Sequence, residues 1–261
     1  LWVGTYTAGV LQMRGGRVIR HLDSAHGLTG SNQVRALLRT GPDTLWIGTS
    51  RGLVRLQGGA MRHFGVEDGL PRDYVMALHQ ARNGDVWVGT ADGAVWIAGD
   101  LAQPIRADEA MDARDILGFA DDEDGTVWMA SDRGLLRYRN GRLALLGLRQ
   151  GMPVDTIFQV VDDRAGHFWL SSNRGVLRVR RADMDAVLDG RRPTLNVDQF
   201  TEVDGLASAQ CNGTSGSSAV LAPDGRVWVA TARGAAVVDP AALQGYTREL
   251  PPVVIERVRA N

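Results

Sequence analysis

The chain has 261 residues, a formal net charge of −1 and 29 basic residues, all of which are arginine. Scattered charges of both signs exclude the basic footprint of a nucleic-acid-binding protein. The absence of lysine excludes a P-loop, Schiff-base chemistry and serine–lysine catalysis. A single cysteine, Cys211, excludes a disulfide framework and a cysteine-based zinc site.

A short apolar segment with a central tryptophan recurs along the chain, reading L-W-V-G-T at residues 1–5 and V-W-V-G-T at residues 86–90. The tryptophans are Trp2, Trp46, Trp87, Trp128, Trp169 and Trp228. Their successive separations are 44, 41, 41, 41 and 59 residues. A nearly fixed period in this range indicates a repeat fold.

The unit from residue 73 to 111 shows what one repeat contains. Its apolar or β-prone segments are residues 74–80, 85–90, 94–98 and 103–107. The turn pairs Asn83-Gly84, Asp92-Gly93 and Gly99-Asp100 separate them. Four short strands in one such repeat predict one blade of a β-propeller.

We therefore expect an all-β propeller of four-stranded antiparallel blades, with six recognisable blades, truncated from a ring of seven. The first blade is expected to be incomplete, with strands only at residues 1–5, 10–14 and 17–22. The next blades are expected at residues 34–64, 74–107 and 115–146, the fifth from residue 156, and the sixth at 218–238.

Two segments depart from the repeat. Residues 181–194 form an insert in the fifth blade, and a short helix is expected at residues 183–188. After Pro251-Pro252, residues 253–259 alternate apolar and charged side chains. The expected division is therefore a propeller over residues 1–250, followed at 251–261 by either its closing strand or the start of another domain.

Burial explains why the tryptophan segment repeats. A single blade is apolar on both faces, so it must stack on its neighbours around an axis. One tryptophan per blade supplies a large, stiff wedge for each contact, and the small residue two positions later leaves room where blades converge. The alternative, an aromatic platform for a ligand, is disfavoured because aliphatic residues flank the tryptophans.

A second motif recurs between the blades, for example V-E-D-G-L at residues 66–70 and E-V-D-G-L at residues 202–206. Followed by G-L-P-x-x-x-V and D-x-x-G-x-x-W-x-G-T-x-x-G-L, it resembles the two-component regulator propeller repeat. The resemblance covers essentially the whole chain and is most specific at residues 204–255. Two departures weaken single turns: residues 109–111 read E-A-M in place of glycine-leucine, and Asp43 replaces a turn glycine.

This resemblance implies the periplasmic sensor region of a hybrid histidine kinase or a membrane-bound diguanylate cyclase, ending at the start of a Y-Y-Y domain. It also implies a membrane-anchored parent, a homodimer, and a signalling output domain beyond Asn261. The fragment itself would then be a non-catalytic ligand-sensing module.

No catalytic residue, metal site or cofactor is expected. The five histidines lie in different blades or turns, without metal-ligand spacing. They are His21, His26, His63, His79 and His167. The acidic turn at residues 121–125 lacks the ligand pattern of a calcium loop, and residues 213–218 lack a nucleophile elbow.

Propeller geometry places the candidate binding residues on one face around the central channel. The loops that reach this face are the connections between blades and those between the second and third strand of each blade. The candidates are Asn32, Arg51, Arg72, Asp73, Tyr74, Asp92, Arg114, Arg133, Asn173, Arg174, Gln210, Asn212 and Arg233.

Arginines interspersed with carboxylates and amides favour a small polar or anionic ligand, such as a saccharide or an organic acid. Three other interpretations stay open at this point. The side chains are simply solvated, the propeller is a protein–protein scaffold, or it is a lyase or glycosidase.

Overall fold

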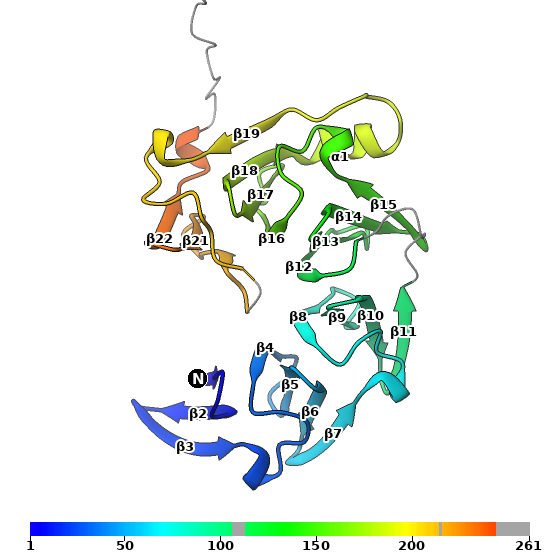
Figure 1. The fold of residues 1–261 in the computed structure, drawn as a ribbon, viewed down its shortest axis with the longest axis vertical. Helices are drawn as coiled ribbons and strands as arrows, with labels where there is room; N and C mark the ends of the chain where they lie inside the picture. Colours follow the sequence, from blue (N-terminus) through cyan, green and yellow to red (C-terminus); the bar gives the residue numbers. More distant parts are fainter. Residues whose placement is uncertain (106–112, 214–215, 244–261) are drawn as a thin grey trace, which may run out of the picture.

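The computed structural model describes residues 1–105, 113–213 and 216–243. These residues form six antiparallel sheets arranged around a common centre (Figure 1). The fold is a six-bladed β-propeller with one α-helix, which confirms the predicted fold class. Within the described residues, the first and last sheets contain three strands and the other four sheets contain four.

The blades follow one another along the chain. Blade 1 contains β1 (Trp2–Gly4), β2 (Val10–Arg14) and β3 (Arg17–Leu22). Blade 2 contains β4 (Val34–Arg39), β5 (Thr44–Thr49), β6 (Gly52–Gln57) and β7 (Ala60–Phe64). Blade 3 contains β8 (Val75–Gln80), β9 (Val86–Thr90), β10 (Gly93–Ala98) and β11 (Leu101–Ile105).

Blade 4 contains β12 (Ile116–Asp121), β13 (Val127–Ser131), β14 (Gly134–Arg139) and β15 (Arg142–Leu146). Blade 5 contains β16 (Ile157–Asp162), β17 (His167–Ser172), β18 (Gly175–Arg180) and β19 (Val197–Phe200). Blade 6 contains β20 (Ala219–Leu221), β21 (Val227–Thr231) and β22 (Gly234–Val238). The helix α1 (Arg181–Leu188) lies where the sequence predicts one, with Met184 and Val187 buried.

Short 3-10 turns occupy most of the connections between blades. They are η1 (Ser24–His26), η2 (Val66–Asp68), η4 (Leu148–Gln150) and η5 (Glu202–Asp204), with η6 (Ala241–Leu243) after blade 6. The recurring motif ends each of the first four turns with a glycine in the left-handed conformation, for example Gly69 with φ 101°. The V-E-D-G-L motif is thus the sequence of a capped turn.

Neighbouring blades pack through their innermost strands: β1 on β4, β4 on β8, β8 on β12, β12 on β16, and β16 on β20. Four of the blade tryptophans are buried between one blade and the next, namely Trp46, Trp87, Trp128 and Trp169. Trp46 lies among Val75, Val88 and Val95 of blade 3, and Trp128 among residues of blade 5. The wedge interpretation is confirmed for these four.

The tryptophans at the two ends of the chain differ from the rest. Trp2 is half-buried, and Trp228 exposes 39% of its surface. Val220 and Val237 are the cross-strand partners of Trp228, and both are exposed too. The expectation of six equivalent wedges is therefore wrong for Trp228, because no described blade covers this face of blade 6.

The small residue two positions after the tryptophan lies where blades converge, as predicted. A Cβ on Gly48 would come within 2.6 Å of the Val75 side chain, and one on Gly89 within 2.6 Å of the Ile116 carbonyl oxygen. Both contacts are closer than van der Waals packing allows.

Two predicted features lie outside the described residues. One is the strand at residues 253–259, together with the proposed domain division at 251–261. The other is the segment at residues 109–111, which departs from the repeat sequence. In the part of the chain that the structure describes, no helix has the length and apolarity needed to cross a bilayer.

Candidate functional site

A small cavity lies at the centre of the ring. Its lining comes from the innermost strands β4, β8, β12 and β16 and from the segment that enters blade 6. The backbone N–H of Gly216 in that segment donates to the carbonyl of Arg35 in blade 2, at 2.8 Å. This cavity has a volume of about 80 Å³.

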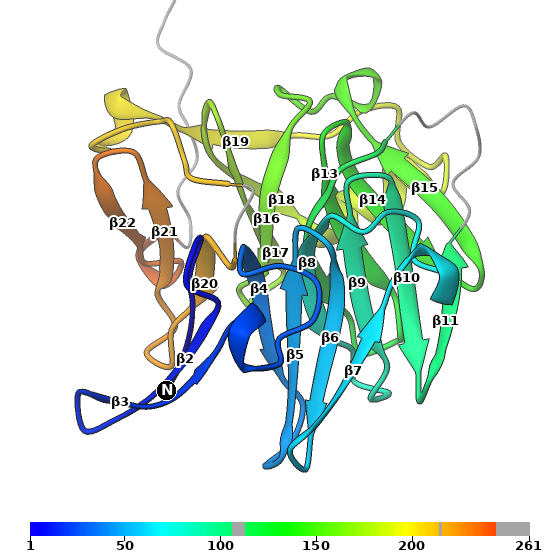
Figure 2. The ribbon, with the colours of Figure 1, turned by 60° about the horizontal axis from the view of Figure 1, so that its bottom comes forward.

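The predicted binding residues lie on turns and connections at the ends of the strands, and Figure 2 shows these ends in a second view. The turn between the second and third strand of each blade is held by the hydroxyl group that ends the tryptophan strand. In blade 3, Thr90 Oγ1 donates to the Gly93 carbonyl at 2.9 Å and accepts the backbone N–H of Asp92 at 3.2 Å.

The same pair of bonds recurs at Thr49, Ser131, Ser172 and Thr231. These hydroxyl groups fix the backbone beneath predicted site residues. Those residues are Arg51, Asp92, Arg133, Arg174 and Arg233. The sequence analysis missed this role, although the signal was the Thr or Ser that follows the small residue in every repeat.

A charged cluster lies over blades 3 and 4. Arg72 and Asp92 form an exposed ion pair at 3.6 Å. The backbone N–H groups of Arg114 and Asp115 both donate to Asp132 Oδ1, at 3.0 and 3.2 Å. Burial raises the pKa of the Asp115 carboxyl group, and the neighbouring Asp132 and Asp92 charges add to this effect. The structure thus brings together three predicted residues, Arg72, Asp92 and Arg114. The carboxylates of Asp115 and Asp132 lie in the same cluster.

Three predicted residues instead stabilise the loops that carry them. Asn32 accepts the backbone N–H of Ser24 at 2.7 Å, and Asp73 accepts that of Val66 at 3.0 Å. The Tyr74 ring lies beneath the guanidinium of Arg35, 4.6 Å from its centroid. A β-bulge between Val34 and Ala36 sets the direction of Arg35.

The remaining predicted residues are exposed on the turns of blades 2, 4, 5 and 6. They are Arg51, Arg133, Asn173, Arg174, Gln210, Asn212 and Arg233. Near Arg233, the Glu202 carboxylate accepts the backbone N–H of Ala209, and this hydrogen bond lowers its pKa, with a smaller contribution from the Arg233 charge. No single cavity gathers these residues among the pockets of the described chain.

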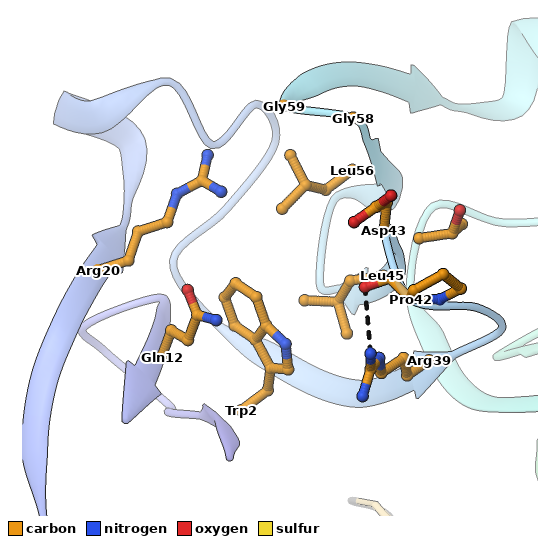
Figure 3. Close-up of a pocket in the computed structure, with 11 residues that line it drawn as sticks. Trp2, Gln12, Arg20, Arg39, Pro42, Asp43, Leu45, Leu56, Gly58 and Gly59 are labelled. Atoms are coloured by element: carbon orange, nitrogen blue, oxygen red, sulfur yellow. Dashed lines mark hydrogen bonds between the residues drawn. The ribbon is translucent and has the colours of Figure 1, made fainter. Parts of the chain in front are cut away.

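Two larger polar cavities lie at the opposite ends of the strands. One, of about 210 Å³, lies between blades 1 and 2 (Figure 3). The Trp2 indole lies near its centre, with Gln12 and Arg20 on one side and Asp43 on the other. Another, of about 450 Å³, is lined by Arg82, Glu123, Asp162, Arg164, Gly166 and Arg181. None of the predicted binding residues lines either cavity.

One conclusion of the sequence analysis needs correction. It treated His21 and His26 as isolated, but the structure brings both imidazoles beside Asp23, with ligating atoms within 4.8 Å of one another. The sequence H-x-D-x-x-H contains this arrangement, because η1 turns the chain back between the two histidines.

Comparison with known proteins gives three findings. Residues 69–92 match the sequence profile of the two-component regulator propeller. No curated protein sequence matches the chain significantly. The extracellular domain of the hybrid two-component system BT3049 from B. thetaiotaomicron is similar in structure, with a TM-score of 0.69 at 18% identity over 100% of this chain and 40% of that one.

The extracellular domain of the hybrid two-component system BT4673 from the same organism has a TM-score of 0.70 at 16% identity, over 90% of this chain and 30% of that one. The chain therefore spans less than half the length of either domain. Virginiamycin B lyase from Staphylococcus aureus is more distant, with a TM-score of 0.57 at 13% identity, over 84% of this chain and 72% of the lyase. At these identities the structural similarities concern the fold alone. The chain is a β-propeller in which one segment, residues 69–92, matches the two-component regulator propeller repeat.

Proposed function

We propose that this propeller is the ligand-sensing part of a bacterial transmembrane receptor. It lies in the periplasm, binds a small polar or anionic ligand, and passes the signal to a C-terminal histidine kinase or diguanylate cyclase. Support comes from the repeat match at residues 69–92 and from the two extracellular domains that share the fold. The propeller itself is not catalytic, and its membrane-anchored parent is a homodimer.

The observation that carries the proposal is the array of turns around the central channel. Five turns are held by the same hydroxyl group and present polar side chains to one face. Among the described residues, the guanidinium groups of Arg51 and Arg174 make no hydrogen bond or ion pair, so they are available to a carboxylate or a sugar hydroxyl group.

Trigalacturonate and citrate are suitable probes, because one is an anionic saccharide and the other an organic acid. Isothermal titration should show binding of at least one of them to the wild-type protein. The double variant Arg51→Ala/Arg174→Ala should weaken that binding at least tenfold, since it removes both unpaired guanidinium groups and with them a charge-assisted hydrogen bond to the probe.

Arg142→Ala is the matched control, because Arg142 is exposed on a turn at the opposite ends of the strands. The affinity of Arg142→Ala for the probe should equal that of the wild type. The proposal for this face fails if neither probe binds, or if the control variant weakens binding as much as the double variant does.

The signalling part of the proposal is tested separately. The gene sequence beyond Asn261 should encode a membrane-spanning helix followed by a kinase or cyclase domain. A stop codon directly after Asn261 would contradict a receptor and would favour a scaffold protein or an enzyme.

A further inference from the structure

The connection between blades 1 and 2 gathers three side chains that can each bind a metal. Asp23 Oδ1 lies 2.6 Å from His26 Nδ1, and Asp23 Oδ2 lies 3.5 Å from His21 Nε2. The two imidazole rings are 5.6 Å apart between centroids. One ligating atom from each residue therefore lies within 4.8 Å of the other two.

The local backbone holds these residues in place. His21 belongs to β3, and Asp23 is the N-cap of η1, where its Oδ1 also accepts the backbone N–H of His26 at 2.9 Å. Gly27 ends the turn in the left-handed conformation, with φ 87°. Asn32, at the entrance to blade 2, accepts the backbone N–H of Ser24 in the same turn. The turn is thus fixed at both ends.

The Asp23 side chain is only 17% exposed, whereas the His26 side chain is 62% exposed. A shielded carboxylate flanked by two imidazoles, one of them open to solvent, provides negative charge and an entry path for a cation.

The equivalent turn of blade 2 shows which of these three residues the propeller fold itself requires. His63 is the counterpart of His21, and both Nε2 atoms contact a carbonyl of the adjacent turn: Ala8 at 2.6 Å from His21, and Arg51 at 2.9 Å from His63. In blade 2, however, Gly65 and Asp68 replace Asp23 and His26. The fold therefore accounts for His21 but requires neither Asp23 nor His26 at these positions.

We propose that His21, Asp23 and His26 form a binding site for a divalent transition metal of the zinc type. Two imidazoles and one carboxylate suit Zn²⁺, Ni²⁺ or Cu²⁺ better than Ca²⁺ or Mg²⁺, which prefer oxygen ligands alone. In a tetrahedral zinc site the ligating atoms lie about 3.3 Å apart. The His21 ring must turn away from the Ala8 carbonyl to present a nitrogen lone pair, and water completes the coordination.

A metal bound there would join the end of β3 to the turn that leads into blade 2. Its role would be to fix the junction of these two blades, independently of any ligand on the channel face. This site therefore does not depend on the proposed sensing function.

Titration of the untagged protein with ZnCl₂, followed by calorimetry, tests the proposal. The wild type should bind one Zn²⁺ per chain. His26→Ala removes an exposed ligand, and Asp23→Asn keeps an oxygen that can cap the turn but loses the charge. Each variant should weaken binding at least tenfold, because loss of even an outer-shell partner of a metal ligand typically lowers metal affinity about 10- to 100-fold.

The matched control is His63→Ala, which removes the equivalent carbonyl contact in blade 2 and leaves the three ligands intact. It should bind Zn²⁺ as the wild type does. Thermal unfolding in EDTA should give the same midpoint for His26→Ala as for the wild type, which separates loss of metal from loss of fold. The proposal is overturned if the wild type binds no Zn²⁺, if His26→Ala binds it as tightly as the wild type, or if His63→Ala weakens it equally.

Discussion

Each buried indole in this fold has a polar N–H group that needs an acceptor. The first residue of the turn before the tryptophan strand provides it in three blades. Trp128 Nε1 donates to Asp122 at 2.8 Å, Trp169 Nε1 to Asp163 at 3.1 Å, and Trp46 Nε1 to Thr40 at 3.2 Å. In blade 3 the corresponding residue, six positions before Trp87, is Ala81, whose side chain has no hydrogen-bond acceptor.

Asp163 tests how much this arrangement stabilises the fold. Its side chain is 1% exposed, and it accepts the backbone N–H groups of Ala165 and His167 as well as the Trp169 indole. Asp163→Ala should therefore lower the free energy of unfolding by about 3 kcal/mol, because three donors lose their acceptor. Urea denaturation measures this change.

Asp224→Ala serves as the control, since Asp224 lies within the equivalent turn of blade 6 but is exposed and pairs with Arg226. Its effect should be clearly smaller. Equal losses of unfolding free energy in the two variants would show that the buried hydrogen bonds of Asp163 stabilise the fold no more than the exposed interactions of Asp224 do.

Asp122 should give the protein an unusual dependence of stability on pH. Its carboxylate is fully buried, Oδ1 has no hydrogen-bond partner among the described residues, and burial raises its pKa despite the Trp128 hydrogen bond and the Arg181 charge. A raised folded-state pKa means that ionisation costs stability as the pH rises from below the unfolded pKa to above the folded one.

Asp122→Asn removes that ionisation. The stability of the variant relative to the wild type should therefore be higher at pH 7 than at pH 4, as measured by urea unfolding at both values. The same difference at both pH values would contradict the assignment.

The sequence predicted the tryptophan positions but not these acceptors. An aspartate in a hairpin turn has an evident local role, so nothing in its immediate neighbours reveals that it also binds an indole six residues later. Likewise, the sequence analysis assigned His21 and His26 to different blades or turns and saw no metal-ligand spacing. The geometry of η1 shows that the two side chains lie close together.

At the scale of single elements, the turn between the second and third strands combines a stabilising hydroxyl group with side chains that we propose for recognition. Its hydroxyl group is buried in blade 3, where Thr90 satisfies both the Gly93 carbonyl and the Asp92 N–H. Thr90→Val keeps the shape of the side chain and removes the hydroxyl group. It should reduce the free energy of unfolding by about 1 to 2 kcal/mol in urea denaturation.

The matched control is Thr44→Val, because Thr44 begins a strand in blade 2 and its side-chain hydroxyl makes no hydrogen bond among the described residues. A loss for Thr90→Val no larger than the loss for Thr44→Val would show that the hydroxyl group does not hold the turn.

Element boundaries followed well from turn pairs such as Asn83-Gly84, because those residues tolerate the positive φ that the turn needs; Gly84 has φ 91°. The four β-bulges at the start of β4, β8, β12 and β16 were not predicted. A bulge adds one residue without changing composition, so alternation alone does not reveal it.

At the scale of the molecule, burial of the tryptophans depends on having a blade to pack against. Trp128→Ala should reduce the free energy of unfolding by about 3 to 5 kcal/mol, because it leaves a cavity between blades 4 and 5. Trp228→Ala should cost at most about 1.5 kcal/mol, since its side chain is already partly in solvent. Chemical denaturation of the two variants checks the ranking, and equal losses would contradict it.

The repeat period was sufficient to predict the ring of blades, because stacking is the only way to bury both faces of each sheet. It could not predict the backbone hydrogen bond from Gly216 to Arg35, because these residues are far apart in the sequence and such a contact leaves no periodic signal.

The central claim is that the strands serve stacking and that the turns on the channel face serve recognition. Amide hydrogen exchange, measured by mass spectrometry with trigalacturonate, with citrate and without either, tests it most directly. The account predicts slower exchange in peptides that contain residues 50–52, 72–74, 91–93, 132–134 and 173–175. Slower exchange confined to the opposite turns at residues 81–85, 122–126 and 163–167, or no change anywhere, would contradict it.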